Sequence, residues 1–138
     1  MTEQTATVSR TVSLPANPRE VWAVIGGFQD LAAWHPVVRE CRHEAAGDRE
    51  YRHLVTEDGA ELTEELLSSG PHSYHYRINK PGPLPVAHYE ATLSADSGAD
   101  GGAVVTWSSS FVPTAEGAES AVAGIYEAGL DALAKKFG

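Results

Sequence analysis

Apolar and polar residues alternate with a period of two over residues 6–14. The even positions are apolar except for Arg10, and the odd positions carry only threonine and serine. This alternation, with β-branched residues on the apolar face, predicts a half-buried strand. Arg10 therefore either points inward as a cation of a ligand site or packs its aliphatic stem while its guanidinium reaches water.

The pattern becomes helical directly after this strand. Asn17 is a good N-cap, Pro18 suits the first helical position, and Glu20 completes a capping box. Apolar residues then recur at helical spacing as far as Gly26 and Gly27. We expect a short amphipathic helix that ends near this glycine pair.

The stretch "DLAAWHPVV" at 30–38 joins a second helical turn to a strand. Asp30 can cap a turn that runs to Trp34, and Pro36 forbids its extension. Trp34 and His35 therefore lie where the turn becomes a strand, and such joints often hold ligands. We expect these two residues to shape one wall of a pocket entrance.

Short apolar runs separated by turn signals fill the centre of the chain. Their spacing and their hairpin-length loops predict an antiparallel meander rather than parallel βαβ units. The loop "NKPGPLP" at 79–85 is rich in proline, so it is expected to be a stiff lip. We place the strands near residues 37–43, 50–56, 60–68, 73–79, 86–95 and 103–112.

A long amphipathic helix is expected at the end of the chain. Thr114 can cap it, and its apolar stripe continues to Phe137. Gly124 and Gly129 each cost about 1 kcal/mol relative to alanine inside a helix. Their presence indicates either that the helix backbone approaches another part of the protein closely or that the cost is tolerated as sequence drift.

The order of elements is thus a strand, two small helices, six strands and a long helix, which is an α+β arrangement. A twisted seven-stranded sheet is wider than one helix, which is about 10 Å across. If the sheet curls around the helix, space remains between them. We therefore expect a cavity lined by inward-facing side chains.

Composition limits the partners that the chain can bind. The 138 residues suit a single domain over 1–138. A net charge of −9, with no basic cluster beyond Lys135-Lys136, disfavours nucleic acid and anionic membrane surfaces. The single cysteine, Cys41, excludes an internal disulfide and fits a reducing compartment. Because we find no signal peptide and no apolar run of about 20 residues, we expect a cytoplasmic protein without a membrane span.

Seven stretches of the sequence resemble the bacterial polyketide cyclase/dehydrase branch of the START and Bet v 1-like superfamily (SRPBCC). The resemblance covers nearly the whole chain, from about residue 5 to residue 137. It implies a helix-grip fold, in which a seven-stranded antiparallel sheet curls around a long C-terminal helix and two short helices follow the first strand. The stretches are "PREVW", "DLAAWHPVV", "ELTEELL", "SYHYRI", "PLPVAHYEATL", "VVTWSSSF" and "GIYEAGLDAL".

The superfamily includes cyclases, dehydratases, lipid carriers, hormone receptors and co-chaperone-like modules, so the fold alone does not define a function. The resemblance implies a hydrophobic small-molecule ligand, aromatic or polyketide-like, in the internal cavity. Cyclisation or dehydration of that ligand is the sharper hypothesis. The alternatives are a non-catalytic binder or carrier and a protein-interaction module with a small or filled cavity. We expect a monomer or a homodimer.

Glu64 is the most informative single residue. It shares one face of a predicted strand with Leu62 and Leu66. A carboxylate among apolar neighbours is paired, neutralised or next to water in a cavity. Glu64 is therefore a candidate acid or base that could move a proton on a bound ligand.

The partner of Glu64 depends on the turn that precedes its strand. A two-residue turn would place His53 opposite Glu64, whereas a turn with Gly59 as a bulge would place Arg52 there. We favour Arg52, because this register also aligns two leucines and similar proteins often carry an arginine at this position. An Arg52–Glu64 pair forms either the polar end of a ligand site or an ion pair at the rim of the sheet.

Aromatic residues gather on the predicted inward faces of three strands and of the final helix. Each of them alone is best explained as core, but several inward tyrosines require hydrogen-bond partners and so favour a wet cavity. Phenol and indole groups suit a flat, partly oxygenated ligand. The side chains that we expect around the ligand are Trp34, Tyr74, Tyr76, Tyr89, Trp107, Phe111 and Tyr126, with Arg10 and His53 as further candidates.

His35 is the histidine that we single out for chemistry. At the mouth it could act as a general base or bind a ligand carbonyl, while the alternative is a surface residue at a corner of the chain. His72 and His75 point to opposite faces of a strand and cannot chelate together. With no HExxH pattern, no Cys₂His₂ pattern and no Gly-rich phosphate loop, the sequence predicts no metal and no cofactor.

Overall fold

The computed structural model describes residues 4–138 and contains one antiparallel sheet of seven strands. The strand order is β1-β7-β6-β5-β4-β3-β2, so the first and the last strand of the chain are neighbours. The strands are β1 (Ala6–Leu14), β2 (Val38–Ala46), β3 (Arg49–Thr56), β4 (Glu61–Gly70), β5 (Ser73–Lys80), β6 (Val86–Ser97) and β7 (Ala103–Pro113). The predicted antiparallel meander is confirmed.

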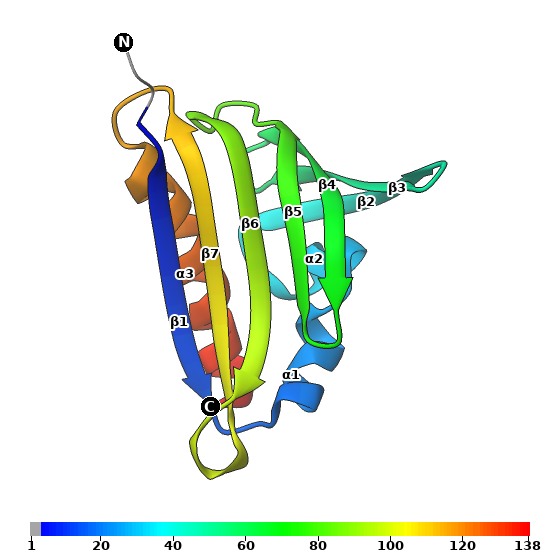
Figure 1. Cartoon of the computed structure of the whole chain (residues 1–138), viewed down its shortest axis with the longest axis vertical. Helices are drawn as coiled ribbons and strands as arrows, with labels where there is room; N and C mark the ends of the chain where they lie inside the picture. The colour runs from blue at the N-terminus through cyan, green and yellow to red at the C-terminus, as the bar shows by residue number, and fades with distance from the viewer. Residues whose placement is uncertain (1–3) are drawn as a thin grey trace.

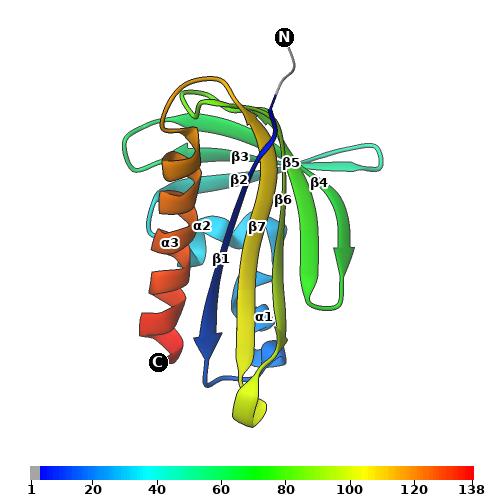
Figure 2. The ribbon, with the colours of Figure 1, turned by 60° about the vertical axis from the view of Figure 1, so that its left-hand side comes forward.

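The long helix α3 (Ala118–Phe137) stands along β1 on the inner side of the curled sheet (Figures 1 and 2). The short helices α1 (Pro18–Ile25) and α2 (Leu31–Trp34) follow β1, with 3-10 turns at η1 (Phe28–Asp30) and η2 (Ala99–Gly101). The Asn17 side chain caps α1 by accepting a hydrogen bond from the backbone N–H of Glu20. This arrangement is the helix-grip fold that the sequence predicts.

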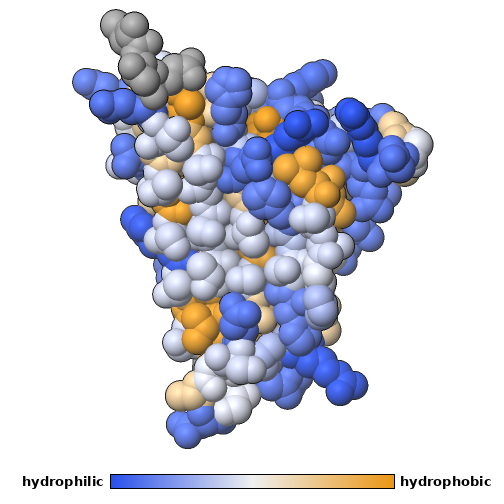
Figure 3. All heavy atoms as spheres, in the orientation of Figure 1, coloured by the Kyte–Doolittle hydropathy of each residue, from blue (hydrophilic) through white to orange (hydrophobic). Residues whose placement is uncertain are grey.

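The outer face of the sheet is mostly polar. Figure 3 shows this side as hydrophilic and intermediate side chains, with apolar ones in small separate groups. Strands β1 and β7 alternate between exposed or half-buried residues and buried apolar ones, as the period-two pattern predicts. The apolar side chains of the sheet therefore face inward, toward the helices.

The hairpin between β3 and β4 has the register that places Arg52 opposite Glu64. Gly59 in its turn has a φ of 87°, a left-handed value that glycine adopts without strain. The alternative with His53 opposite Glu64 is excluded, because His53 pairs with Thr63. The favoured turn is confirmed.

Helix α3 begins three residues later than the sequence suggests. Gly117 with a φ of 85°, not Thr114, stands at the N-cap. The backbone N–H of Thr114 instead donates to the carbonyl of Pro85 at 2.9 Å, which holds this residue beside the start of β6. The prediction of Thr114 as the cap was wrong, because a tertiary hydrogen bond outweighs the local capping preference.

Gly129 allows α3 to approach the core closely. A Cβ atom at this position would lie 2.7 Å from Cδ2 of His35 and 3.0 Å from Cζ3 of Trp107. At Gly124, which is exposed, such a Cβ would meet no atom of residues 4–138 within 4 Å, apart from its chain neighbours and the backbone of its own helix. The predicted close approach is therefore present at Gly129 and absent at Gly124.

The two glycines give a matched pair of substitutions. Gly124→Ala should raise the free energy of unfolding by up to about 1 kcal/mol, because alanine is the better helix former. Gly129→Ala should lower the free energy of unfolding by about 1–2 kcal/mol. Overpacking costs about 1–3 kcal/mol, and the better helix propensity of alanine offsets part of this cost. Urea unfolding of both variants measures the difference. Equal effects at the two positions would contradict the close approach.

Candidate functional site

Arg52 and Glu64 form a buried ion pair on the inner face of the sheet. Arg52 is 0 % exposed and Glu64 is 5 % exposed. Nε of Arg52 donates a hydrogen bond of 2.7 Å to Oε1 of Glu64, and Nη2 lies 2.7 Å from the same oxygen. Burial raises the pKa of Glu64, and the charge of Arg52 opposes that rise. The pair therefore lies in the interior and not at the rim of the sheet.

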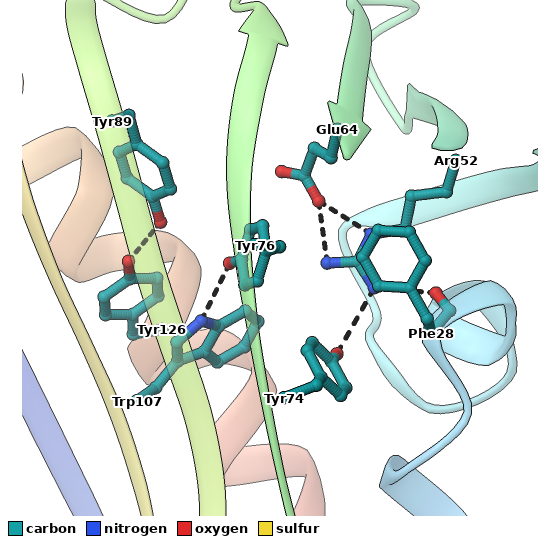
Figure 4. A network of polar contacts seen from close by, with 8 residues as sticks. All are labelled: Phe28, Arg52, Glu64, Tyr74, Tyr76, Tyr89, Trp107 and Tyr126. Carbon is teal, nitrogen blue, oxygen red and sulfur yellow. Dashed lines mark hydrogen bonds and ion pairs between the residues drawn. The ribbon is translucent and has the colours of Figure 1, made fainter. Parts of the chain in front are cut away.

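Aromatic rings and backbone oxygen hold the guanidinium of Arg52 in place (Figure 4). Its Cζ lies 4.2 Å from the ring centre of Phe28, 5.5 Å from that of Tyr74 and 4.8 Å from that of Tyr76. Nη1 donates to the carbonyl of Phe28 at 2.7 Å and to the hydroxyl of Tyr74 at 3.3 Å. These contacts offset part of the cost of burying the charge.

A second polar group of the interior consists of phenols and an indole. Nε1 of Trp107 donates to the hydroxyl of Tyr76 at 3.0 Å, and the hydroxyls of Tyr89 and Tyr126 are hydrogen-bonded to each other. Trp107 also stacks on Tyr126 with ring centres 4.6 Å apart. Burial raises the pKa of Tyr76 and of Tyr89 well above the ordinary value, so both remain neutral near pH 7.

His35 is buried and both of its ring nitrogens are engaged by the backbone. Nε2 donates to the carbonyl of Ile125 at 2.8 Å, and Nδ1 accepts from the N–H of Val37 at 3.2 Å. Burial lowers the pKa of His35, which fits this neutral tautomer, although the hydrogen bond to Ile125 opposes the shift. The ring thus ties α2 to α3 and has no free nitrogen for proton transfer in this arrangement.

A cavity lies between the sheet and α3, but it is small. Its volume is about 50 Å³, far below the roughly 300–1,000 Å³ of ordinary ligand pockets. The aromatic rings described above fill most of the space that the curled sheet leaves. The predicted site residues that line this inner cavity are His35, Arg52, Glu64, Tyr76, Tyr89, Trp107 and Tyr126.

An apolar groove of about 510 Å³ opens on the surface directly outside the inner cavity. The proline-rich loop before β6 contributes Pro83, Leu84 and Pro85 to it, and α3 contributes Ala121 and Ile125. We call this surface the outer groove. The residues that line both the inner cavity and the outer groove are Val37, Thr56, Leu62, Leu84 and Ile125.

Two residues expected at the ligand lie elsewhere. Arg10 is exposed, and its Nε donates to Glu127 on α3 at 2.9 Å. His53 lies on the outer face, where its Nε2 is 2.6 Å from Glu44 and its Nδ1 is 3.1 Å from the hydroxyl of Thr63. His53 points outward because the register directs its neighbour Arg52 inward. Arg10 is exposed because β1 is an edge strand beside α3.

Three further aromatic residues from the predicted set support the cavity without lining it. Trp34 packs against Trp107 with ring centres 5.8 Å apart, and Phe111 stacks on Tyr89 at 5.9 Å. Tyr74 contacts Arg52 through its hydroxyl, which accepts a hydrogen bond from Nη1 (Figure 4). Their role is therefore to position the residues that face the cavity.

The family model described as "Polyketide cyclase / dehydrase and lipid transport" matches residues 5–138. The chain belongs to this family. The resemblance of the sequence to the START and Bet v 1-like superfamily is thereby confirmed. Among curated proteins, none matches the chain.

Solved structures of other proteins are similar to this chain in fold. The protein XoxI from Bacillus cereus is 31% identical, with a TM-score of 0.89 over 96% of this chain and 95% of its own. An uncharacterized protein from Bacillus thuringiensis is 33% identical, with a TM-score of 0.88 over 96% and 98%. The Zhui aromatase/cyclase from Streptomyces sp. R1128 is 18% identical, with a TM-score of 0.76 over 96% and 93%, a likeness that shows the fold alone.

The described part of this family member contains neither a metal-binding cluster nor a membrane-spanning helix. Within residues 4–138, no three histidine, cysteine, aspartate or glutamate side chains come together as metal ligands. Over the same range, no helix is long and apolar enough to cross a membrane.

The residues that separate the inner cavity from the outer groove were not singled out as site residues from the sequence. Leu84 had a usable signal, since it is the one large apolar residue of the loop at 79–85. The only signal at Ile125 is its apolar character within the amphipathic final helix. Their joint role depends on how the loop folds onto α3, which no local pattern describes.

Proposed function

We propose that the protein binds a hydrophobic small molecule, entering from the outer groove into the inner cavity. The observation that carries this proposal is the shared apolar wall, in which Leu84 and Ile125 separate a surface groove from a polar, aromatic interior. Membership of a family described by polyketide cyclases, dehydrases and lipid transport supports the same reading. Rotation of these two side chains joins the two spaces, so the small cavity is the closed form of a larger site.

A neutral fluorescent probe tests this proposal. N-phenyl-1-naphthylamine should bind saturably with one site per chain and gain fluorescence, because the joined space is apolar. Leu84→Arg places a charged side chain in the wall and should weaken binding about tenfold or more, the factor that corresponds to about 1.4 kcal/mol. Leu67→Arg is the matched control, since Leu67 is an exposed leucine on β4 outside both spaces.

Three results bear on the proposal. Binding to wild type and to Leu67→Arg, with loss in Leu84→Arg, supports it. Equal binding by both variants places the probe elsewhere and contradicts the entrance. No saturable binding by the wild-type protein contradicts ligand binding, and the interaction module with a filled cavity then becomes the better explanation.

A catalytic role is the second candidate, and the position of Glu64 favours it. Only one oxygen of its carboxylate receives the contacts of Arg52, and the other points away from the guanidinium (Figure 4). Burial raises the pKa of Glu64, which suits a group that exchanges a proton with a ligand. In this candidate, Glu64 acts as the base and Tyr76 or Tyr126 donates a hydrogen bond to the developing oxyanion.

Proton abstraction can be measured on 5-nitrobenzisoxazole, whose C–H deprotonation breaks the N–O bond and releases a coloured phenolate. Wild type should open this ring faster than Glu64→Gln by about 100-fold, the usual contribution of a positioned base. Glu65→Gln is the control, because Glu65 occupies the next position on β4 but faces outward toward Arg77. If all three proteins react at the same rate, Glu64 is not a catalytic base.

A further inference from the structure

The ion pair leaves one donor and one acceptor unused beside the inner cavity. Nη2 of Arg52 is fully buried and makes no hydrogen bond within residues 4–138. Its contact with Oε1 of Glu64, at 2.7 Å, is an ion pair, and Nη2 has no hydrogen-bond partner besides it in this part of the chain. Figure 4 shows Nη2 on the Tyr76 side of the guanidinium, and the second oxygen of Glu64 directed to the same side.

A buried N–H group without an acceptor costs free energy, so native proteins rarely leave one unmatched. The other nitrogens of Arg52 are satisfied, because Nε bonds Glu64 and Nη1 bonds the carbonyl of Phe28 and the hydroxyl of Tyr74. The unmatched donor of Arg52 is thus Nη2, and Arg52 is one of the residues that line the inner cavity. Next to it stands a carboxylate oxygen that can accept a hydrogen bond.

The charges of the pair balance each other. Arg52 and Glu64 carry opposite charges in direct contact, so neither has an excess charge to offer a ligand. A ligand carboxylate placed near Nη2 would be buried beside the carboxylate of Glu64, without a free cation to compensate it. A ligand ammonium near the free oxygen of Glu64 would likewise be buried beside the guanidinium of Arg52, without a free anion to compensate it.

We infer that the ligand of the proposed site is uncharged and carries a group that both donates and accepts hydrogen bonds, a hydroxyl or a primary amide. Its oxygen accepts from Nη2 of Arg52, and its O–H or N–H donates to the free oxygen of Glu64. The aromatic rings of Tyr76, Trp107 and Tyr126 then contact the apolar part of the ligand. This inference rests on the proposed function, because it assigns the polar end of the same cavity.

Three small probes that share a 4-methylphenyl ring and differ in one polar group separate the requirements. They are 4-methylphenol, which donates and accepts; 4-methylanisole, which only accepts; and 4-methylbenzoate, which is anionic at pH 7. Calorimetry and NMR titration of the ¹⁵N-labelled full chain measure the affinities. We expect 4-methylphenol to bind about tenfold or more tightly than 4-methylanisole, which leaves the Glu64 oxygen unpaired, and about 100-fold or more tightly than 4-methylbenzoate.

The variant Glu64→Gln reverses the charge requirement. Without the carboxylate, Arg52 has an uncompensated positive charge, so 4-methylbenzoate should gain affinity by about tenfold or more, while 4-methylphenol gains none. Glu65→Gln is the control, and it should leave the order of the three probes unchanged. If Glu64→Gln does not fold, the comparison of the affinities of the three probes for the wild-type protein still decides the question.

The outcomes distinguish this inference from the proposed function. If the three probes bind wild type with equal affinity, or if 4-methylbenzoate binds best, the cavity binds ligands but the inference is wrong. If none of the three binds while N-phenyl-1-naphthylamine does, the polar pair takes no part in binding and the inference is again wrong. If no probe binds at all, both proposals fail.

Discussion

Arg52→Leu is expected to lower the free energy of unfolding by about 3–5 kcal/mol, the cost of leaving one member of a buried ion pair uncompensated. The substitution removes the guanidinium that contacts Oε1 of Glu64 and that packs against Phe28. Leucine fills part of the same volume, so the loss arises mainly from the stranded carboxylate. Guanidinium chloride unfolding at pH 7 measures it.

Arg77→Leu is the control for this substitution. Arg77 also bonds a glutamate of β4, Glu65, at 2.8 Å, but its side chain is 44% exposed. Its loss should cost no more than about 1 kcal/mol. The double variant Arg52→Leu/Glu64→Leu should recover most of the loss, because it removes both buried charges. If the double variant is less stable than Arg52→Leu, the stranded charge is not the cause.

The pH dependence of Arg52→Leu gives an independent check. Burial raises the pKa of Glu64, and the variant lacks the cation that opposes this rise. Such a group binds its proton more tightly in the folded state than in the unfolded state. The free-energy cost of burying its charge is therefore absent below the pKa that it has in the unfolded state, and it develops as pH rises through the pKa that it has in the folded state. The stability deficit of Arg52→Leu relative to wild type should therefore shrink as pH falls toward about 4.5. A constant deficit between pH 4.5 and 8 would contradict this cause.

Trp107→Ala should lower the free energy of unfolding by about 3–5 kcal/mol and create a cavity that binds indole. Trp107 is 2% exposed, stacks on Tyr126 and donates to the hydroxyl of Tyr76. Free indole can restore the stacking and the hydrogen bond. At 100 times its Kd, it should return about 2.7 kcal/mol, which appears as an increase in Tm.

The controls for this prediction test each interaction. 1-Methylindole has no N–H group and should therefore stabilise Trp107→Ala less than indole does. Trp22→Ala removes a half-buried tryptophan that contacts His72 and Tyr74, and indole should not raise its Tm. An equal response of the two variants to indole would show non-specific binding.

The sequence predicts those features that depend on periodicity and turn chemistry. The face of β4 that carries Glu64 follows from alternation, and its pairing with Arg52 follows from the position of Gly59 in the turn. These two features are local, or are separated by one hairpin. The helix-propensity cost of the glycines in α3 indicates a close approach but does not say where it occurs, since it is present at Gly129 and absent at Gly124.

The features that the sequence does not predict depend on three-dimensional packing. Alternation correctly places Arg10 on the inner face of β1, but at the sheet edge this face meets Glu127 of α3 and water. The volume of the inner cavity depends on how rings from four elements fill one space. The wall of Leu84 and Ile125 joins residues about 40 positions apart in the chain.

The pairing of β1 with β7 constrains the biosynthesis of the protein. Ala6 lies opposite Phe111, so the sheet cannot be completed until more than 100 residues have been synthesised. Helix α3, which closes the inner cavity, follows even later, from Ala118 to Phe137. Contacts of such long sequence separation form slowly. A nascent chain on the ribosome therefore exposes the inner face of its strands, and the inner cavity is enclosed only after residues 118–137 have left the exit tunnel.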